Sequence, residues 1–495
     1  MKQVTSVGGA PIRILVVGGG CAGMSAALRL QRGLAERLRR GEAEITVVEP
    51  QPYLTYQPLL AEVAAGSIDP RHVVVPLRRV LPDCRVLTAR ITRIDHATRR
   101  AWADAAARGE PPAPTELAYD VLVVAAGSVS RTAPVPGLAE HGLGFSTVGE
   151  AVSLRNHVLE QLDLASSTRD PALRQAALTF VFVGGGYAGV GALAELEDMA
   201  RYAVRGYHNV AQEDLRWVLV EATDRILAEA GAHGSGPEVA AHTLAQLRDR
   251  SIDVRLGTTL ESATGGLMLL SDGSRFAART LVWTAGVRPS PLLRDTDLPL
   301  DAEGRVRCLP SLQAVGPDGG ALPGVWAAGD CAAVPDPFAD GRPCAPNAEH
   351  AFAQSQVLAD NVIAWLDSVE AAPGTAGDAG RDRRAPISQG QGREGRDGRG
   401  QSDYLPDLAG CSTSLGLGRG VAHTRRGRVT GRRAWLLHRA RHLRRLPTAD
   451  RRVRVLTDWL LAGLFTREVV SLGTLEHPRS EFEAGFAEGG PAGHG

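Results

Sequence analysis

The chain has 495 residues, of which 44% are hydrophobic and 22% charged, which is typical of a globular protein of about three domains. Lysine plus arginine number 55 and aspartate plus glutamate also 55, so the charge balance argues against a nucleic-acid-binding protein. The six cysteines include no C-x-x-C or C-x4-C pair, which argues against a zinc site or a dithiol centre of the usual spacing. We therefore expect no metal and no nucleic-acid partner.

The first predicted elements are a buried strand over 12–17, a glycine turn and a helix, followed by a strand that ends at Glu49. Gly18, Gly20 and Gly23 have the G-x-G-x-x-G spacing of a dinucleotide-binding turn. The first glycine allows the tight turn, the second lets the backbone approach a pyrophosphate, and the third lets helix and strand pack closely. The helix N-terminus attracts the phosphates, and Glu49 can accept the ribose hydroxyls.

The same order of elements returns after residue 178. The strand LTFVFV leads into Gly184, Gly186 and Gly189, then into a helix and a second strand that ends before Glu221. A carboxylate at that place binds a free ribose 2′-hydroxyl and repels a 2′-phosphate, so this second site is expected to prefer NADH over NADPH. A duplicated strand–turn–helix–strand–acid pattern predicts two Rossmann-type domains.

Three further strands end in small residues. YDVLVVAAG ends at Gly127, RTLVWTAG ends at Gly286, and VWAAGD ends at Asp330. The first two each complete one copy of the duplicated pattern. The expected fold is therefore α/β, with two interleaved dinucleotide-binding domains.

The last quarter of the chain begins with a compositionally distinct stretch. Residues 371–403 hold eight glycines and six arginines, and Ile387 is the one large apolar residue among them, which predicts a disordered insertion. Order is expected again over 404–475, in an α-rich segment, before a flexible tail over 476–495.

The segment 404–475 is strongly basic. It carries twelve arginines and one acid between Val421 and Val455, and Leu436, Ala440 and Leu443 share one face of a predicted helix. A basic amphipathic helix suits an anionic membrane surface, and packing of the leucines onto the rest of the protein is the alternative. No signal peptide or membrane-spanning run is evident. We therefore expect a cytoplasmic protein, either soluble or peripheral on the inner face of the plasma membrane.

Two dinucleotide turns together with Gly329–Asp330 resemble the two-domain FAD/NAD(P)-dependent pyridine nucleotide oxidoreductases. Several segments are similar to those of type II NADH dehydrogenases, the NADH:quinone oxidoreductases within that group. They are QPLLAEVAAGSID (57–69), VGGGYAGV (183–190), WTAGV-x-P (283–289), WAAGDCAAVP (326–335) and PNAEHA (346–351).

The resemblance implies a glutathione-reductase-like fold. Its FAD domain is expected to be discontinuous, over 1–150 and 297–370, with an NADH domain inserted at 151–296. Such enzymes are monotopic flavoproteins that pass a hydride from NADH to FAD and two electrons to a quinone, without pumping protons. No cysteine follows Glu49 closely, so no protein thiol relay is expected.

The resemblance also assigns site residues. Those expected at FAD are Gly18, Gly20, Cys21, Ala22, Gly23, Glu49, Gln57, Ala126, Gly127, Gly329 and Asp330. Those expected at NADH are Gly184, Gly186, Tyr187, Gly189, Glu221, Ala285 and Gly286. Glu349 is the candidate catalytic residue, as a group that tunes the flavin or donates a proton.

The sequence departs from the family pattern at several places. The family has a glutamate where this chain has Gly191, a threonine where it has Ala126, and a glutamine where it has Glu349. The second glutamine of that last motif is replaced or displaced here, where Ala353 is followed by Gln354. The insertion at 371–403 is a further departure. Two other functions therefore stay open: an NADH reductase of a soluble electron-transfer protein or small molecule, and a slow flavin-binding redox sensor or scaffold. A homodimer is as compatible with the sequence as a monomer.

Overall fold

The computed structural model of the chain describes residues 10–105, 114–228, 236–339, 341–370, 400–406, 412–424, 427–465 and 469–471. The chain forms two compact units. The first unit comprises Met1–Tyr56, Val74–Arg131 and Val287–Leu408, and the second comprises Gln57–Val73, Thr132–Gly286 and Ala409–Gly495.

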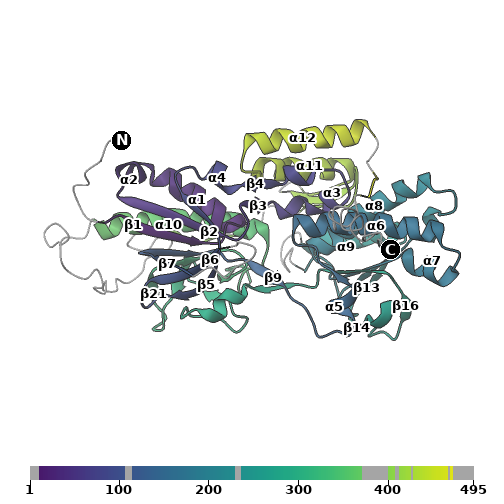
Figure 1. The fold of residues 1–495 in the computed structure, drawn as a ribbon, viewed down its shortest axis with the longest axis horizontal. Coiled ribbons are helices and arrows are strands. Elements are labelled where there is room, and N and C mark those ends of the chain that lie inside the picture. The colour runs from purple at the N-terminus through teal and green to yellow at the C-terminus, as the bar shows by residue number, and fades with distance from the viewer. Residues whose placement is uncertain are drawn as a thin grey trace, which may run out of the picture. The chain divides into compact units, whose positions relative to one another are not determined.

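The first unit is built on an eight-stranded sheet in the order β20-β21-β8-β1-β2-β5-β6-β7 (Figure 1). Neighbouring strands from β21 through β5 are parallel, and the strands at both edges are antiparallel. The central strands read as unbroken Val, Ile and Leu runs because both faces of a parallel sheet are covered. The strands are β1 (Ile12–Val17), β2 (Ala43–Glu49), β5 (Arg85–Asp95), β6 (Arg100–Ala105), β7 (Thr115–Ala118), β8 (Val121–Val124), β20 (Gln313–Val315) and β21 (Ala321–Ala327).

Two long helices, α1 (Cys21–Gly33) and α10 (Ala348–Glu370), lie side by side in the first unit (Figure 1). Arg29 on α1 pairs with Asp360 on α10 at 2.5 Å, on the exposed side of this contact. The smaller elements of the unit are α2 (Ala35–Arg40), β3 (Tyr53–Thr55), β4 (Val74–Pro76), α4 (Leu77–Val80), β9 (Ser128–Ser130), β18 (Val287–Pro289), β19 (Val306–Arg307) and β22 (Ala332–Ala333).

The second unit is built on a five-stranded parallel sheet in the order β10-β17-β11-β12-β13. Its strands are β10 (Gly142–Leu143), β11 (Thr179–Val183), β12 (Arg216–Val220), β13 (Asp253–Arg255) and β17 (Thr280–Trp283). Its helices are α3 (Leu60–Ala64), α5 (Leu138–His141), α6 (Val148–Ser167), α7 (Pro171–Ala177), α8 (Tyr187–Ala203) and α9 (Gly236–Asp249). A small antiparallel sheet joins β14 (Leu260–Ser262), β15 (Leu267–Leu270) and β16 (Arg275–Ala277).

The C-terminal part of the second unit contains both strands and helices. Three antiparallel strands, β23 (Ser412–Ser414), β24 (Gly420–Thr424) and β25 (Gly427–Thr430), precede the hairpin of α11 (Gly431–Arg445) and α12 (Ala449–Leu464). The α-rich segment expected over 404–475 therefore also holds a small sheet. None of the helices in the described ranges is long and apolar enough to cross a membrane.

The α/β fold with two Rossmann-type sheets is the one expected from the sequence. The boundaries of the compact units fall at other residues than the expected domain ends at 150 and 296, and residues 57–73 belong to the second unit. Most of the insertion, 371–399, and the tail over 476–495 lie outside the described residues.

The last residues of the expected insertion, 400–403, are placed against α10. The Asn361 side chain donates to the Ser402 carbonyl oxygen at 2.8 Å and accepts from the Ser402 N–H at 2.8 Å. One buried amide therefore satisfies both backbone groups of Ser402, a residue that the sequence had placed within the insertion.

Candidate functional site

The first glycine turn joins β1 to α1, and an added side chain would clash at two of its three motif glycines. Gly18 has a φ of +101°, which favours glycine, and a Cβ there would overlap the Ala125 carbonyl. A Cβ at Gly23 would overlap the Gly18 carbonyl, so the third glycine allows the close helix–strand contact. A Cβ at Gly20 would meet nothing within 4 Å. The backbone is therefore open to a ligand at Gly20.

Glu49 stands at the end of β2 beside this turn. Its carboxylate accepts hydrogen bonds from the Gly19 N–H at 2.7 Å and the Gln51 N–H at 3.1 Å. Burial raises the pKa of Glu49, and the two backbone N–H donors oppose that rise. A carboxylate held in this way beside a helix N-terminus fits the ribose and pyrophosphate of a dinucleotide.

The strand end at Gly329–Asp330 lies next to the same turn. A Cβ on Gly329 would meet the Ala22 Cβ at 3.2 Å and the Ala351 Cβ at 3.5 Å, so the N-terminal turns of both α1 and α10 approach it. Burial raises the pKa of Cys21, the first residue of α1, and the charge of Asp330 raises it further. Ala126 and Gly127 follow β8 in the same unit. Ten of the eleven residues expected at FAD therefore belong to the first unit.

The eleventh, Gln57, belongs to the second unit. Its side-chain amide donates to the Ser146 carbonyl at 3.1 Å. Its part in FAD binding stays a prediction.

The second glycine turn repeats the geometry of the first. Gly184 has a φ of +114° and its Cβ would overlap the backbone of Thr284, while a Cβ at Gly189 would overlap the Gly184 carbonyl. Glu221 accepts from the Gly185 N–H at 2.6 Å, as Glu49 does from Gly19. The duplicated sequence pattern therefore forms the same backbone-to-glutamate hydrogen bond in both turns.

The Glu221 carboxylate is held on both oxygens. Its second oxygen accepts from the Thr223 N–H and the Thr223 hydroxyl, each at 2.8 Å. Gly186 caps α8 and Tyr187 begins it, while Ala285 and Gly286 follow β17. All seven residues expected at NADH therefore lie in the second unit.

Glu349 lies in the first turn of α10, where it is half-buried. Its charge raises the pKa of the neighbouring His350, although burial lowers that pKa more strongly. A carboxylate in this turn opposes the build-up of negative charge close to the helix N-terminus. Its effect on a bound flavin stays a prediction.

The described cysteines are poorly suited to thiol chemistry. Burial raises the pKa of Cys21, Cys84, Cys331 and Cys344 to about 12. Because the thiolate is the reactive form, these groups are inert at neutral pH.

A buried charged cluster joins α3 to the C-terminal hairpin within the second unit. The Glu62 carboxylate, 2% exposed, accepts from the Arg439 guanidinium at 2.7 Å and from the Trp459 indole N–H at 2.6 Å. The guanidinium lies over the rings of Trp435 and Trp459, at 3.7 and 4.7 Å from their centroids. We call these four residues the hairpin clamp. The sequence analysis did not anticipate it.

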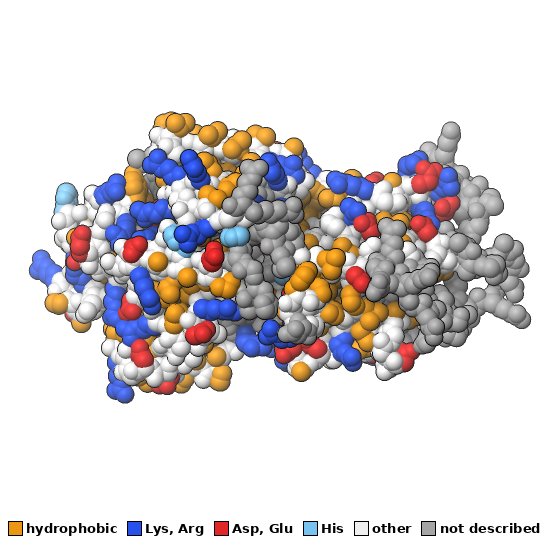
Figure 2. Space-filling model, turned by 180° about the vertical axis from the view of Figure 1, so that it is seen from behind, with side chains coloured by type: hydrophobic (Ala, Val, Ile, Leu, Met, Phe, Trp, Pro, Cys, Tyr) orange, Lys and Arg blue, Asp and Glu red, His pale blue; other side chains and the backbone are white. Residues whose placement is uncertain are grey.

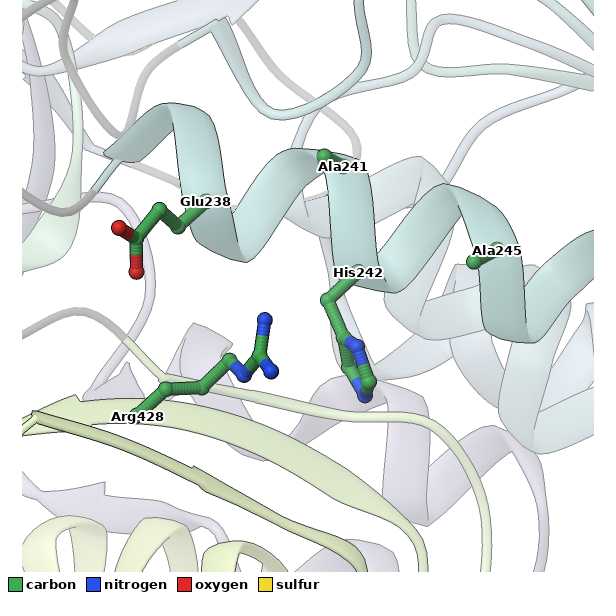
Figure 3. Close-up of a pocket in the computed structure, with 5 residues that line it drawn as sticks. All are labelled: Glu238, Ala241, His242, Ala245 and Arg428. Carbon is green, nitrogen blue, oxygen red and sulfur yellow. The ribbon is translucent and has the colours of Figure 1, made fainter.

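A cavity of about 680 Å³ lies between α9 and β25 in the second unit. Glu238 and His242 point toward it from α9, and Arg428 points toward it from β25 (Figure 3). It is open and contains none of the residues that the sequence assigned to a nucleotide.

Sequence reasoning also missed two side chains at the Gly329–Asp330 turn. The Ser128 hydroxyl donates to Asp330 at 2.7 Å, and the Gln354 amide oxygen accepts from the Gly329 N–H at 2.8 Å. Ser128 directly follows the alanine-glycine end of β8, so its place in the sequence was a usable signal. Gln354 is the glutamine that follows Ala353, where the family motif has its second glutamine, and the packing of α10 brings its side chain to the turn.

Comparison with known proteins agrees with this geometry. Residues 12–355 match the family model described as pyridine nucleotide-disulphide oxidoreductase. The chain is 29% identical over 334 residues to a type II NADH:quinone oxidoreductase of Mycobacterium tuberculosis, covering 65% of this chain and 67% of that protein. It is 27% identical to an external alternative NADH-ubiquinone oxidoreductase of Yarrowia lipolytica, covering 60% of this chain and about half, 53%, of that protein.

A solved structure shares the fold. The structure of NDH2 from Plasmodium falciparum in complex with NADH superposes with a TM-score of 0.74 at 14% identity, covering 93% of this chain and 99% of that one. The expected kinship with type II NADH dehydrogenases is confirmed by these relatives, and so is the expected fold class. With two dinucleotide turns of matching geometry and a family match over most of its length, the chain belongs to the pyridine nucleotide-disulphide oxidoreductase family.

Proposed function

We propose that the chain is a type II NADH:quinone oxidoreductase, which transfers a hydride from NADH to FAD and then two electrons to a quinone. The observation that carries the proposal is the pair of glycine turns. In each turn a backbone N–H donates to a carboxylate at the end of the next strand, Glu49 in the first and Glu221 in the second. The relatives named NADH:quinone and NADH-ubiquinone oxidoreductase support quinone as the acceptor.

The chain's own residues bind and orient the cofactors. In the first unit the N-terminus of α1 would attract the pyrophosphate of FAD, Glu49 would accept hydrogen bonds from ribose hydroxyls, and Asp330 would hold the ribityl–pyrophosphate region. In the second unit the N-terminus of α8 would attract the pyrophosphate of NADH, and Glu221 would accept hydrogen bonds from its ribose hydroxyls. When bound, FAD supplies the chemistry that links a two-electron donor to a quinone.

The nucleotide preference follows from Glu221. Its carboxylate is fixed by Gly185 and Thr223, so it opposes a 2′-phosphate without having to reorient. We expect NADH to reduce the flavin far faster than NADPH, and Glu221→Ala to bring the two rates to within about tenfold of each other. Anaerobic stopped-flow reduction at matched nucleotide concentrations measures this. Equal rates in the unaltered protein would show that Glu221 does not select the nucleotide.

The acceptor is tested by the second half-reaction. Protein reduced anaerobically with one equivalent of NADH is mixed with a water-soluble quinone, and the return of the oxidised flavin spectrum is followed. The proposal expects rapid reoxidation by quinone. Reoxidation by a small acidic electron-transfer protein, with no response to quinone, would instead support the soluble-acceptor function.

Glu349 is proposed to tune the flavin. A carboxylate in the first turn of α10 opposes the negative charge that a reduced flavin carries, so Glu349→Gln is expected to raise the flavin midpoint potential. For a two-electron couple, a shift of ~30 mV corresponds to about 1.4 kcal/mol, a reasonable size for one partly screened charge. If Glu349→Gln and the unaltered protein have the same flavin midpoint potential at every pH between 5 and 9, Glu349 does not tune the flavin.

The α11–α12 hairpin is proposed to dock on a membrane. Its exposed side carries large apolar residues, seen in Figure 2 as hydrophobic side chains gathered along the top of the view. We call them the docking face: Leu436, Leu437, Val453, Leu456, Leu460, Leu461, Leu464 and Phe465. The sequence predicts Leu436, Ala440 and Leu443 on one face of this helix; Leu436 and Ala440 are exposed and Leu443 is half-buried.

Charge at the docking face favours anionic lipid. Arg433, Arg444, Arg452 and Arg454 are all exposed on the same two helices. An apolar strip flanked by arginines is the pattern of a helix that lies in the headgroup region. The cytoplasmic face of the plasma membrane, which is rich in anionic lipid, is the proposed location.

Vesicle flotation tests the docking face. Leu460 and Leu464 are 57% and 77% exposed, so replacing both by aspartate removes apolar contact with lipid without opening the core. We expect affinity for vesicles that contain phosphatidylglycerol to fall at least a hundredfold, since each buried leucine contributes about 1.5–3 kcal/mol. Leu267→Asp on β15, at a leucine 50% exposed outside the hairpin, is the matched control. If the double variant still floats with vesicles, or changes only the oligomeric state, the face does not bind lipid.

A further inference from the structure

The Gly329–Asp330 turn is held from two sides by side chains of the first unit. It follows β21, and its glycine is flanked by Ala22 of α1 and Ala351 of α10. Three elements that are far apart in the sequence therefore fix the position of this turn. What remains for side chains to fix is the direction of the Asp330 carboxylate and of the Gly329 N–H.

Ser128 fixes the carboxylate. Its hydroxyl donates to one oxygen of Asp330 at 2.7 Å, and within the described ranges it is the one hydrogen-bond donor to that carboxylate. Burial raises the pKa of Asp330, while the Ser128 hydrogen bond and the nearby His350 lower it. Ser128 therefore stabilises the ionised form, in which the other oxygen can accept a hydrogen bond from a ligand.

Gln354 fixes the backbone. It is 1% exposed on α10, and its amide oxygen accepts from the Gly329 N–H at 2.8 Å. Because this hydrogen bond is buried, the turn cannot rotate without breaking it and leaving the Gly329 N–H without its partner.

Ser128 also belongs to a two-stranded ribbon, β9 with β18. Pro289 of β18 pairs with Ser128, and the Ser290 N–H donates to the Gly127 carbonyl at 3.0 Å. β9 ends one residue before the chain passes into the second unit, and β18 begins where the chain returns. A ligand that fixes the Asp330 carboxylate would therefore also restrain the β9–β18 ribbon, through the hydrogen bond between Ser128 and Asp330.

We propose that Ser128 is a positioning residue for FAD, which aims the Asp330 carboxylate while Gln354 holds the turn, and which links FAD occupancy to the order of the β9–β18 ribbon. This rests on the proposed binding of FAD in the first unit. Because linkage is reciprocal, a ribbon that helps to orient Asp330 must itself be stabilised when FAD binds.

The first experiment measures the release of FAD from purified holoprotein by the rise in flavin fluorescence after dilution. Ser128→Ala is expected to release FAD about tenfold faster, since it removes a hydrogen bond to a charged group. Ser128→Thr keeps the hydroxyl and should restore slow release. Gln354→Leu should also speed release, whereas Gln356→Leu, two residues along α10 and bonded to the exposed Arg29, should not.

A double-mutant cycle separates positioning from general stability. If Ser128 acts through Asp330, Ser128→Ala should change FAD release little in an Asp330→Asn background, whereas a merely structural defect would add to it. Hydrogen exchange at saturating FAD supplies a readout independent of release. Residues 128–130 and 287–288 should gain protection on FAD binding in the unaltered protein, and gain much less in Ser128→Ala.

The outcomes distinguish this inference from the function beneath it. Unaltered protein that holds no FAD would overturn both. Unaltered protein that holds FAD, with equally slow release from Ser128→Ala, would overturn the inference alone. So would additive effects in the cycle, or ribbon protection that does not depend on the Ser128 hydroxyl.

Discussion

Replacing Arg439 by methionine should lower the free energy of unfolding by about 3–5 kcal/mol, because it leaves the buried carboxylate of Glu62 without its ion-pair partner. Arg439 is 4% exposed and Glu62 is 2% exposed, so water cannot take the place of the guanidinium without rearrangement. The contacts of that guanidinium with the rings of Trp435 and Trp459 would be lost as well. Urea denaturation measures the change.

A matched variant and a second substitution make this test specific. Arg433→Met alters an exposed arginine on the same helix and should change stability by no more than about 0.5 kcal/mol. Glu62→Leu combined with Arg439→Met removes both charges and should recover part of the loss. If Arg439→Met costs no more than Arg433→Met, the hairpin clamp does not hold α11 and α12 in place.

The loss in Arg439→Met should also depend on pH. Burial already raises the pKa of Glu62 above its unfolded value, and removing the arginine raises it further. Above the unfolded pKa, the unfolded chain ionises more readily than the folded one, so stability falls as pH rises. The difference in free energy of unfolding between Arg439→Met and the unaltered protein should therefore be smaller at pH 5 than at pH 8. A deficit that is constant between these values would mean that Glu62 stays ionised without its partner.

Gly189→Ala should slow the reduction of the flavin by NADH about 10- to 100-fold while leaving the FAD content unchanged. The added Cβ would overlap the Gly184 carbonyl and crowd the Thr284 hydroxyl, which forces the second glycine turn open. Overpacking of this kind typically costs 1–3 kcal/mol. The FAD turn belongs to the other unit and is untouched. Stopped-flow reduction and the flavin-to-protein absorbance ratio measure the two effects separately.

Gly149→Ala is the control for this prediction. It adds the same methyl group to a helix of the same unit, and its Cβ would meet nothing closer than 3.9 Å. It should leave both NADH reduction and FAD content as they are. Normal NADH reduction by Gly189→Ala would argue that this turn does not bind the nucleotide.

The nucleotide turns were predictable because their chemistry is local. The tight backbone at Gly18 and the close contact at Gly23 follow from spacing alone, and the acid at the next strand end needs only the parallel order of β1 and β2. Because the same reasoning applies at Gly184 and Gly189, the duplication could be read directly from the sequence. The match of fold and family bears this out.

The buried polar contacts were not predictable because their partners are remote in sequence. Arg439 is 377 residues from Glu62, and Ser128 is 202 residues from Asp330. On α11 the helical period identifies two faces but not which one is buried. The ion pair of Arg439 with Glu62 determines which face is buried. The face with His438, Arg439 and His442 packs inward, and Leu436 and Leu437 stay exposed.

The strands β23–β25 were missed for a related reason. Each has three to five residues, and serine, threonine and glycine make up seven of the twelve, so no apolar alternation identifies them. Contacts with other elements of the second unit stabilise these strands. Ser414 of β23 donates to the buried Glu195 of α8 at 2.6 Å, a contact that composition does not reveal.

The central claim is most directly tested by the stoichiometry of anaerobic turnover. Purified, FAD-loaded protein is supplied with NADH and a water-soluble quinone, and NADH loss and quinol formation are measured together. The account predicts sustained turnover with one quinol formed for each NADH oxidised, since a hydride carries the two electrons that a quinone accepts. Flavin that is reduced by NADH but forms no quinol with any quinone offered would contradict it.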